Sequence, residues 1–285
     1  MTLHDYGQVC ATFGLMFQGD EVCAAPSPRR CLSCATKHYG PARGPVTVVA
    51  NAWSAARRSR GVAHFAAVSQ AVATAVSLDG GTGWPRQAGV QAPVIPNFIA
   101  DELVVDQIAP LQPDAPLLYV GTLSRNKGVD VLLEAYRSIA GAPELLLAGR
   151  ADPDDQWSFP AGVRWLGEVP HAKVLDLLRC ARAAVVPSVW PDPCPTVVLE
   201  AMAAGRPVVA AASGGIPDLV QDGVTGIVVR PGDAAALAAA IERVLSDDEA
   251  SGGLGLAGRD RARDFTASAV VERIERMYAD AAARQ

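Results

Sequence analysis

The chain has 285 residues, of which 50% are hydrophobic and 19% are charged. These proportions are those of ordinary folded proteins, and they exclude an intrinsically disordered chain and a fibrous repeat. The 25 basic and 30 acidic residues give a net charge of −5, which argues against a dedicated nucleic-acid-binding protein. At roughly 150 residues per domain, the length predicts two modest domains or one large one.

Neither a targeting signal nor a membrane span is indicated by the sequence. The N-terminal sequence MTLHDYG has no basic stretch followed by an apolar run, so it does not resemble a secretory signal. The longest uncharged segment, 62–78, is too short and too polar to span a bilayer. Six cysteines in a chain without such a signal favour thiols or metal ligands over a disulfide framework. We therefore expect a cytoplasmic protein, with the inner face of the cell membrane as the alternative.

The first part of the chain, 1–105, is expected to be part of an α/β domain. Strand candidates at 45–51, 63–69 and 93–98 are separated by alanine-rich helical stretches. The prolines and acidic residues of 99–115 are typical of an interdomain linker.

Four cysteines near the N-terminus form the pattern C-x12-C-x7-C-x2-C, with His38 shortly after them. Zinc takes about four such ligands in a tetrahedral arrangement, but a single C-x2-C pair is only half of the usual signature. We therefore expect free or packed thiols, and a structural zinc is the less favoured alternative. The cysteines are Cys10, Cys23, Cys31 and Cys34.

From residue 116 onward, short apolar runs alternate with helical patterns, as in a parallel sheet covered on both faces. Apolar residues at i, i+3, i+4 and i+7 predict helices over 129–136 and 174–181. The alternation predicts a doubly wound, Rossmann-like domain over 106–266, whose ligands bind beyond the carboxyl ends of the strands. A further helix is expected over 267–283. The strand candidates are 116–121, 144–149, 163–167, 183–188, 207–212 and 226–229.

Four prolines within 187–195 predict a rigid loop at the end of a strand. The helix that follows, 197–204, is apolar on all sides except at Glu200, so we expect it to be buried. A buried carboxylate must find hydrogen-bond donors. Those donors are either a structural arginine, Arg182 or Arg206, or a ligand with vicinal hydroxyls such as a ribose.

The same loop offers two further features for binding. Asp192 lies on it, eight residues before Glu200. The unpaired backbone amides at the start of the following helix, around Thr196, can receive an anion. The loop and the helix are therefore expected to form part of a ligand site.

Two cations and a helix start converge in the segment 120–136. Gly121 ends a predicted strand, and Arg125 and Lys127 precede the helix. This arrangement suits a diphosphate, although an exposed lysine at a helix start is the alternative for Lys127. The triphosphate-binding pattern G-x-x-x-x-G-K-[ST] and the dinucleotide pattern G-x-G-x-x-G do not occur here.

These motifs, in this order, resemble glycosyltransferase family 4. The resemblance is carried by VGTLSRNKGVDVLLEA (120–135), PSVWPDPCPTVVLEAMAAGRPVV (187–209) and the pair GGIPDLV and TGIVV (214–229). It implies an α/β chain of the GT-B type, which has two facing Rossmann-like domains. The C-terminal domain is then complete and the N-terminal one lacks its first part. The resemblance also implies that the final segment, 267–285, packs back toward the first domain.

The resemblance implies roles for individual residues. Lys127 neutralises the donor diphosphate, Glu200 binds the ribose hydroxyls, and Asp192 hydrogen-bonds the transferred sugar. His4, in the sequence TLHD, resembles the family's histidine that ends a first-domain strand and faces that sugar. The expected catalytic residues are His4, Lys127 and Asp192, and the expected donor-binding residues are Gly121, Arg125, Lys127, Asp192, Thr196 and Glu200.

Two positions depart from the family pattern. Asp192 stands where the family usually has a glutamate, so its carboxylate must lie closer to the sugar. Thr122 stands where the family commonly has an arginine paired with the lysine, and Arg125 is expected to supply that charge three residues later.

The implied reaction moves a hexose-type unit from a UDP- or GDP-sugar to a hydroxyl acceptor, with retention of configuration. The acceptor is a glycan, a lipid or a small molecule. The leaving phosphate helps to deprotonate the acceptor while cations stabilise it. That scheme requires neither a cofactor nor a divalent metal. The alternatives are a non-catalytic nucleotide-sugar-binding remnant and, less favoured, a GT-B sugar-nucleotide epimerase.

Two charged clusters have simpler interpretations than a functional one. The acidic residues within 152–155 are expected to form a solvated loop rather than a metal site. The basic cluster of Arg57, Arg58 and Arg60 is interpreted as a solvated helix end, with peripheral contact to anionic lipid as the alternative.

Overall fold

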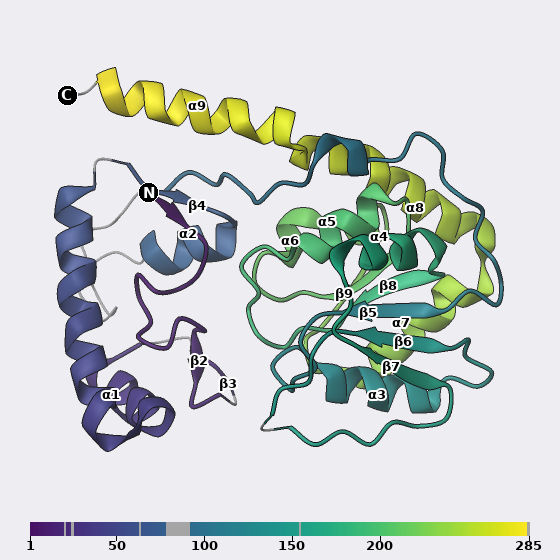
Figure 1. Ribbon diagram of the computed structural model, residues 1–285, viewed down its shortest axis with the longest axis horizontal. Coiled ribbons are helices and arrows are strands. Elements are labelled where there is room, and N and C mark those ends of the chain that lie inside the picture. The colour runs from purple at the N-terminus through teal and green to yellow at the C-terminus, as the bar shows by residue number, and fades with distance from the viewer. Residues whose placement is uncertain (20, 24–25, 63, 78–91, 154, 284–285) are drawn as a thin grey trace. The chain divides into compact units, whose positions relative to one another are not determined.

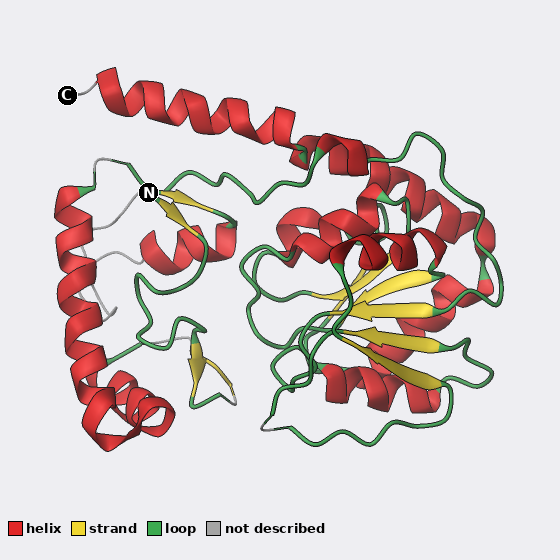
Figure 2. Cartoon of the chain, viewed as in Figure 1, coloured by secondary structure: helices red, strands yellow, loops and turns green. Residues whose placement is uncertain are grey.

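The chain forms two compact units in the computed structural model, and Figures 1 and 2 show their elements. Unit 1 comprises residues 1–96, 190–194 and 271–285, and unit 2 comprises residues 97–189 and 195–270. The structure describes residues 1–19, 21–23, 26–62, 64–77, 92–153 and 155–283.

Unit 1, in its described part, contains two small sheets of two strands each. One pairs β1 with β4 in parallel, and the other pairs β2 with β3 in antiparallel. The longest helix of the unit, α1, follows β3, and a short helix, α2, follows β4. The bounds are β1 (Thr2–Leu3), β2 (Met16–Phe17), β3 (Glu21–Val22), α1 (Pro28–Gly61), β4 (Ala66–Ala67) and α2 (Gln70–Ser77).

Helix α1 consists of two pieces. Its start is capped by Ser27, whose hydroxyl oxygen accepts the backbone N–H of Arg30. At Gly40 the backbone leaves the helical region (φ 84°, ψ 166°), and Pro41 follows directly, so the helix is kinked there. The first piece therefore has its own direction, and it carries two of the N-terminal cysteines.

The prediction of a strand over 45–51 is wrong, because these residues belong to α1. The buried positions Gly44, Val48 and Ala55 are four and seven residues apart, which is a helical spacing. Val49, within the same run, is 68% exposed. The valines favour a strand, but a helix that buries a single stripe accommodates them, and packing outweighs propensity.

The two other strands predicted for this region are much shorter than expected. Within 63–69 only β4 forms a strand, and Ala63 lies outside the described residues. Within 93–98 Val94 forms a single parallel bridge to Ala67. Pro93 and Pro96 lack the N–H groups that would extend the pairing.

Unit 2 is built on a six-stranded parallel sheet, and all six strands predicted from the sequence are confirmed. Most of them are runs of apolar residues, and four of the six are buried along their whole length or nearly so. Such continuous apolar runs are expected where helices cover both faces of a sheet. The strands are β5 (Leu117–Val120), β6 (Leu145–Ala148), β7 (Val163–Gly167), β8 (Ala183–Val186), β9 (Val208–Ala211) and β10 (Ile227–Val229).

The strand order is β10-β9-β8-β5-β6-β7. The chain runs from β5 outward to β7 at one edge and then returns to place β8 on the other side of β5. The order therefore reverses between β5 and β8. In doubly wound sheets the crevice outside the carboxyl ends of two such strands is where ligands bind.

Helices cover the two faces of this sheet: α3 and α7 lie on one face, and α4, α5 and α8 lie on the other (Figure 1). The predicted helices at 129–136, 174–181 and 197–204 are confirmed as α3, α4 and α5. In the described ranges no helix is long and apolar enough to cross a membrane. The helices are α3 (Val129–Ser138), α4 (His171–Cys180), α5 (Thr196–Ala203), α6 (Ile216–Leu219), α7 (Ala234–Ser246) and α8 (Asp248–Ala262).

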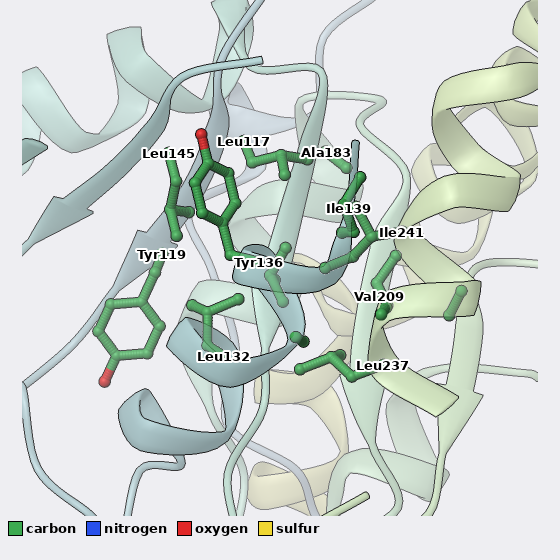
Figure 3. Packing of buried hydrophobic residues seen from close by; sticks show 14 of the residues in the cluster. Leu117, Tyr119, Leu132, Tyr136, Ile139, Leu145, Ala183, Val209, Leu237 and Ile241 are labelled. Atoms are coloured by element: carbon green, nitrogen blue, oxygen red, sulfur yellow. The ribbon is translucent and has the colours of Figure 1, made fainter. Parts of the chain in front are cut away.

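The core of unit 2 lies between the sheet and the helices α3 and α7, as Figure 3 shows. Leu132 and Tyr136 of α3 lie among side chains of β5 and β6, including Leu117 and Leu145. Three of these four side chains are fully buried. Burying such a side chain stabilises the fold by about 1.5 to 3 kcal/mol, so this core fixes α3 against β5 and β6.

The segment predicted as a linker, 99–115, is paired at its start with the residues around the beginning of the last helix. Ile99 forms a parallel bridge with Thr266, and a short 3₁₀ helix, η1 (Asp101–Leu103), follows. The carboxylate of Asp101 accepts the side-chain and backbone donors of Ser268, and these hydrogen bonds lower the pKa of that carboxyl. After η2 (Arg263–Phe265) comes the last helix, α9 (Ala267–Ala283), which confirms the helix predicted there.

Candidate functional site

The loops after β5 and β8 meet at the point where the strand order reverses. The backbone N–H of Val189 donates to the carbonyl oxygen of Asn126 over 3.1 Å. Gly128, in the left-handed region at φ 73°, lies so close to the other loop that a Cβ atom there would stand 2.0 Å from the carbonyl oxygen of Pro187. Only glycine fits this contact. The two loops therefore form one packed surface.

A third loop, after β9, joins this surface. Ser213 is buried, and its hydroxyl donates to the carbonyl oxygen of Val189 over 3.3 Å. Gly214 follows in the left-handed region at φ 56° and turns the chain into α6. Three strands thus send their carboxyl-end loops to the same place, which is the site predicted from the sequence.

Glu200 is the fifth residue of α5, and its side chain is 11% exposed. Its Oε1 is 2.9 Å from Nε2 of His171, the first residue of α4. Among the described residues the structure shows no hydrogen bond at Oε2. The partner of Glu200 is therefore a histidine that the sequence reasoning missed.

The two arginines considered as partners of Glu200 bind elsewhere. The guanidinium of Arg182 donates to the carbonyl oxygen of Val244 over 2.8 Å and also pairs with Asp248. Arg206 donates to the carbonyl oxygen of Ala109 over 2.8 Å. Both side chains are buried and hold backbone carbonyls, so neither is available to the Glu200 carboxylate.

Lys127 is held at the end of a tight turn. Its backbone N–H donates to the carbonyl oxygen of Ser124 over 3.1 Å. The N–H of Gly128 donates to the carbonyl oxygen of Arg125 over 2.8 Å. Helix α3 begins two residues after Lys127. The lysine is half-buried.

Arg125 has acidic neighbours. Its backbone N–H donates to Asp155 over 3.0 Å, and its guanidinium Nε lies 3.3 Å from the same carboxylate. Asp130 lies 4.0 Å from another guanidinium nitrogen. These carboxylates offset part of the charge that Arg125 was expected to contribute to an anion site. They also give Asp155 a structural role; Asp154 lies outside the described residues.

Gly121 and Thr196, the two other residues expected to bind the sugar donor, lie where the sequence predicted them, at the end of a strand and at the start of a helix. Gly121 directly follows β5 and has φ 152°. Its carbonyl oxygen would stand 1.9 Å from a Cβ atom at Gly149, so the loops after β5 and β6 also pack backbone to backbone. Thr196 is exposed and is the first residue of α5, where backbone amides are not used by the helix.

His4 and Asp192 belong to unit 1. His4 is exposed and directly follows β1, so it does end a strand as expected. Asp192 is buried on the proline-rich loop, and its backbone N–H donates to the carbonyl oxygen of Trp190 over 2.7 Å.

The N-terminal cysteines are free thiols that line one cavity of unit 1. Burial, together with the nearby Cys10, Cys23 and Cys34, raises the pKa of the Cys31 thiol to about 11. In the part of the chain that the structure describes, no three side chains of His, Cys, Asp or Glu are placed closely enough to hold a metal ion.

The basic cluster near the end of α1 is partly engaged within unit 1. Arg58 donates to the side chains of Gln8 over 2.7 Å and Ser54 over 2.6 Å. The guanidinium of Arg57 lies 4.9 Å from the ring centre of Trp53. Arg60 is exposed. The cluster therefore offers fewer free charges to an anionic surface than its sequence indicates.

A six-stranded parallel sheet with helices on both faces, and carboxyl-end loops that meet at the reversal of strand order, defines a doubly wound, Rossmann-like domain. Residues 115–247 of this domain match the family described as Glycosyl transferases group 1. The chain therefore carries a domain of this glycosyltransferase family, as its motifs predicted.

Curated relatives match the chain over part of their length. The glycogen synthase of Mycobacterium tuberculosis is 36% identical over 176 residues, which cover 58% of this chain and 42% of that protein. The D-inositol 3-phosphate glycosyltransferase of Corynebacterium aurimucosum is 33% identical over 179 residues, which cover 57% and 42%. The chain thus spans less than half of the length of these relatives.

Solved structures share the fold. The sucrose-phosphate synthase of Thermosynechococcus elongatus is 26% identical with a TM-score of 0.70, and the likeness covers 83% of this chain and 63% of that one. Anabaena HepE in complex with UDP-glucose is 22% identical with a TM-score of 0.70, covering 81% and 68%. The chain has the GT-B fold, which confirms the fold that the sequence predicted.

Proposed function

We propose that unit 2 binds a nucleoside-diphosphate sugar, and that the protein transfers the sugar with retention of configuration to a hydroxyl acceptor. The observation that carries this proposal is the setting of Glu200. Its side chain is 11% exposed, and the hydrogen bond with His171 engages one carboxylate oxygen. A ribose presents two vicinal hydroxyl donors, which suit the accepting capacity that remains on the carboxylate.

The diphosphate is assigned to the loop after β5 and to the start of α5. Lys127 supplies a positive charge beside the first turn of α3, and the amides around Thr196 are directed out of the start of α5. Gly121 allows the backbone to approach the ligand closely, because it has no side chain. Arg125 contributes less positive charge to the diphosphate site than Lys127, because its guanidinium is paired with Asp155.

The transfer step is assigned to groups that stabilise charge rather than to a protein nucleophile. Lys127 neutralises the leaving phosphate, which helps to deprotonate the acceptor hydroxyl. Asp192 and His4 are proposed to contact the transferred sugar. Relatives named for glycogen and for inositol 3-phosphate support a polyhydroxylated acceptor. The free thiols support a reducing, cytoplasmic compartment.

Calorimetric titration of the full chain with UDP, GDP, uridine and guanosine tests the donor site. We expect one of the two diphosphates to bind, and to bind more tightly than its own nucleoside, because the site holds both a ribose and a diphosphate. If neither diphosphate binds, the donor site is wrongly assigned.

Lys127→Ala is expected to weaken binding of the preferred diphosphate by about tenfold, because one charge-assisted contact worth roughly 1.5 kcal/mol is lost. Binding of the matching nucleoside should not change. Lys173→Ala is the matched control, since Lys173 is an exposed lysine of α4. An equal loss for the nucleoside and the diphosphate contradicts the role given to Lys127.

His171→Ala is expected to weaken binding of the same diphosphate by about two- to fivefold. The His171 side chain is 63% exposed, so its hydrogen bond with Glu200 contributes up to about 1 kcal/mol. His171→Gln, which keeps an N–H donor, should recover part of the loss in the same titration. No change in His171→Ala would mean that this hydrogen bond does not position the carboxylate.

A further inference from the structure

One side of helix α1 is exposed although it carries large apolar side chains. Val46, Val49 and Trp53 are 67%, 68% and 64% exposed. The residues that this part of the helix buries, such as Val48 and Ala55, lie on the opposite side. A contiguous exposed apolar surface of this kind is characteristic of an interaction site. The side chains form an open hollow that, among the described residues, is lined by α1 alone through Pro45, Val46, Val49, Ala50 and Trp53.

Exposed arginines continue this side of the helix in both directions. Arg43 lies before the hollow, and Arg57 and Arg60 lie after it. All three are exposed, whereas Arg58 donates to the side chain of Gln8 within unit 1. Successive members of the exposed stripe are three or four residues apart, so they follow one side of the helix. The α1 face, as we name this stripe, consists of Arg43, Val46, Val49, Trp53, Arg57 and Arg60.

Helix α1 is strongly basic within an acidic chain. It contains seven arginine and lysine residues and no aspartate or glutamate, although the chain as a whole has a net charge of −5. Positive charge is therefore concentrated on one helix, and the field of the molecule turns this helix toward a negatively charged partner. The partner must also accept apolar side chains, because arginines and apolar residues share the α1 face.

The surface of an anionic lipid bilayer meets both requirements. Its headgroups attract basic side chains, and the boundary between headgroups and acyl chains accepts valine and is favourable for tryptophan. Arginine can keep its guanidinium at the phosphates while its methylene groups lie along the apolar boundary. A second copy of the chain fits less well, because a two-fold contact through this face would bring identical arginines together.

We propose that the α1 face binds the surface of an anionic lipid bilayer. The second piece of the helix lies in the plane of the interface, with Val46, Val49 and Trp53 about 5 to 10 Å into the boundary between headgroups and acyl chains. The arginines of the face lie at the lipid phosphates. The contact belongs to unit 1, and it requires neither the nucleoside-diphosphate sugar nor the transfer reaction.

Co-sedimentation of the full chain with lipid vesicles tests the proposal. Vesicles of phosphatidylcholine and phosphatidylglycerol in equal parts should bind the wild type roughly tenfold or more tightly than vesicles of phosphatidylcholine alone. Each basic residue close to an anionic surface strengthens binding by about fivefold. Added salt should weaken the binding, because it screens these charges. Absence of binding to the anionic vesicles, or equal binding to both kinds, overturns the proposal.

Val49→Glu and Arg57→Glu are each expected to weaken binding to the anionic vesicles by about tenfold or more, because they remove apolar area or positive charge and add a negative charge. The matched controls are Val224→Glu and Arg179→Glu, which change an exposed valine and an exposed arginine of unit 2. Both controls should bind like the wild type. An equal loss in the controls means that net charge governs the binding, and it contradicts the role of the α1 face.

Two further measurements complete the test. Far-UV circular dichroism of Val49→Glu and Arg57→Glu should match that of the wild type, because both residues are exposed and their replacement leaves no cavity. Analytical ultracentrifugation without vesicles tests the other occupant of the face. A wild type that dimerises and a Val49→Glu variant that does not would assign the face to a second copy of the chain and would overturn the proposal.

Discussion

Glu200→Gln is expected to weaken binding of the preferred nucleoside diphosphate by about 10- to 100-fold. The substitution keeps the shape of the side chain but removes the negative charge, and hydrogen bonds to a charged group contribute roughly 1.5 to 3 kcal/mol. The side chain is 11% exposed, so water compensates only partly for the loss. Calorimetric titration of the full chain with UDP and GDP measures the change.

The matched control for this variant is Glu134→Gln, because Glu134 is an exposed glutamate in the middle of α3. It should bind the diphosphate as tightly as the wild type. Far-UV circular dichroism should be the same for both variants, because glutamine fills the same volume as glutamate. An unchanged affinity in Glu200→Gln contradicts the ribose contact.

Gly128→Ala is expected to destabilise unit 2 by roughly 2 to 5 kcal/mol and to abolish diphosphate binding. The new Cβ would stand 2.0 Å from the carbonyl oxygen of Pro187, so the loops after β5 and β8 must move apart. The left-handed conformation, φ 73°, costs an alanine about 1 to 2 kcal/mol, and the overpacking adds about 1 to 3 kcal/mol. Urea unfolding of the full chain measures the loss of stability.

Gly141→Ala separates the two causes. Gly141 has nearly the same backbone angle, φ 68°, but no atom lies within 4 Å of a Cβ placed there. This variant should lose only about 1 to 2 kcal/mol and should bind the diphosphate normally. If Gly128→Ala behaves like Gly141→Ala in both measurements, the contact between the two loops does not shape the site.

The sequence predicted unit 2 well because its signals are local. Runs such as Leu117–Val120 are buried along nearly their whole length, and a helix with apolar residues on one side, α3, follows. Lys127 and Thr196 also fall where the motifs placed them, before α3 and at the start of α5. In a doubly wound sheet these local patterns almost determine the position of the site, because ligands bind where the strand order reverses.

Contacts between distant residues could not be predicted in this way. The partner of Glu200 is His171, 29 residues away, and only the packing of α4 beside α5 brings the two together. The sequence feature that could have indicated this partner was His171, which follows Pro170 shortly after the predicted strand 163–167. Arg182 and Arg206 were reasonable partners by residue type, but backbone carbonyls hold both.

The first part of the chain was harder to predict because its elements are short. The valines around Val48 have strand propensity, yet they form a helix that buries one stripe. The strands of unit 1 are two residues long, too short to produce an alternating pattern. The cysteine spacing did not show that Cys10 and Cys23 line one cavity with Cys31 and Cys34, because turns and short strands bring them there.

The contact between Glu200 and the ribose is tested most directly by a titration cycle. The wild-type chain and Glu200→Gln are each titrated with the preferred diphosphate and with its 2′,3′-dideoxy analogue. We predict that the wild type binds the analogue about 10- to 100-fold more weakly, and that the variant distinguishes the two ligands by less than about threefold. The same preference in both proteins would contradict the assignment of Glu200 to the ribose.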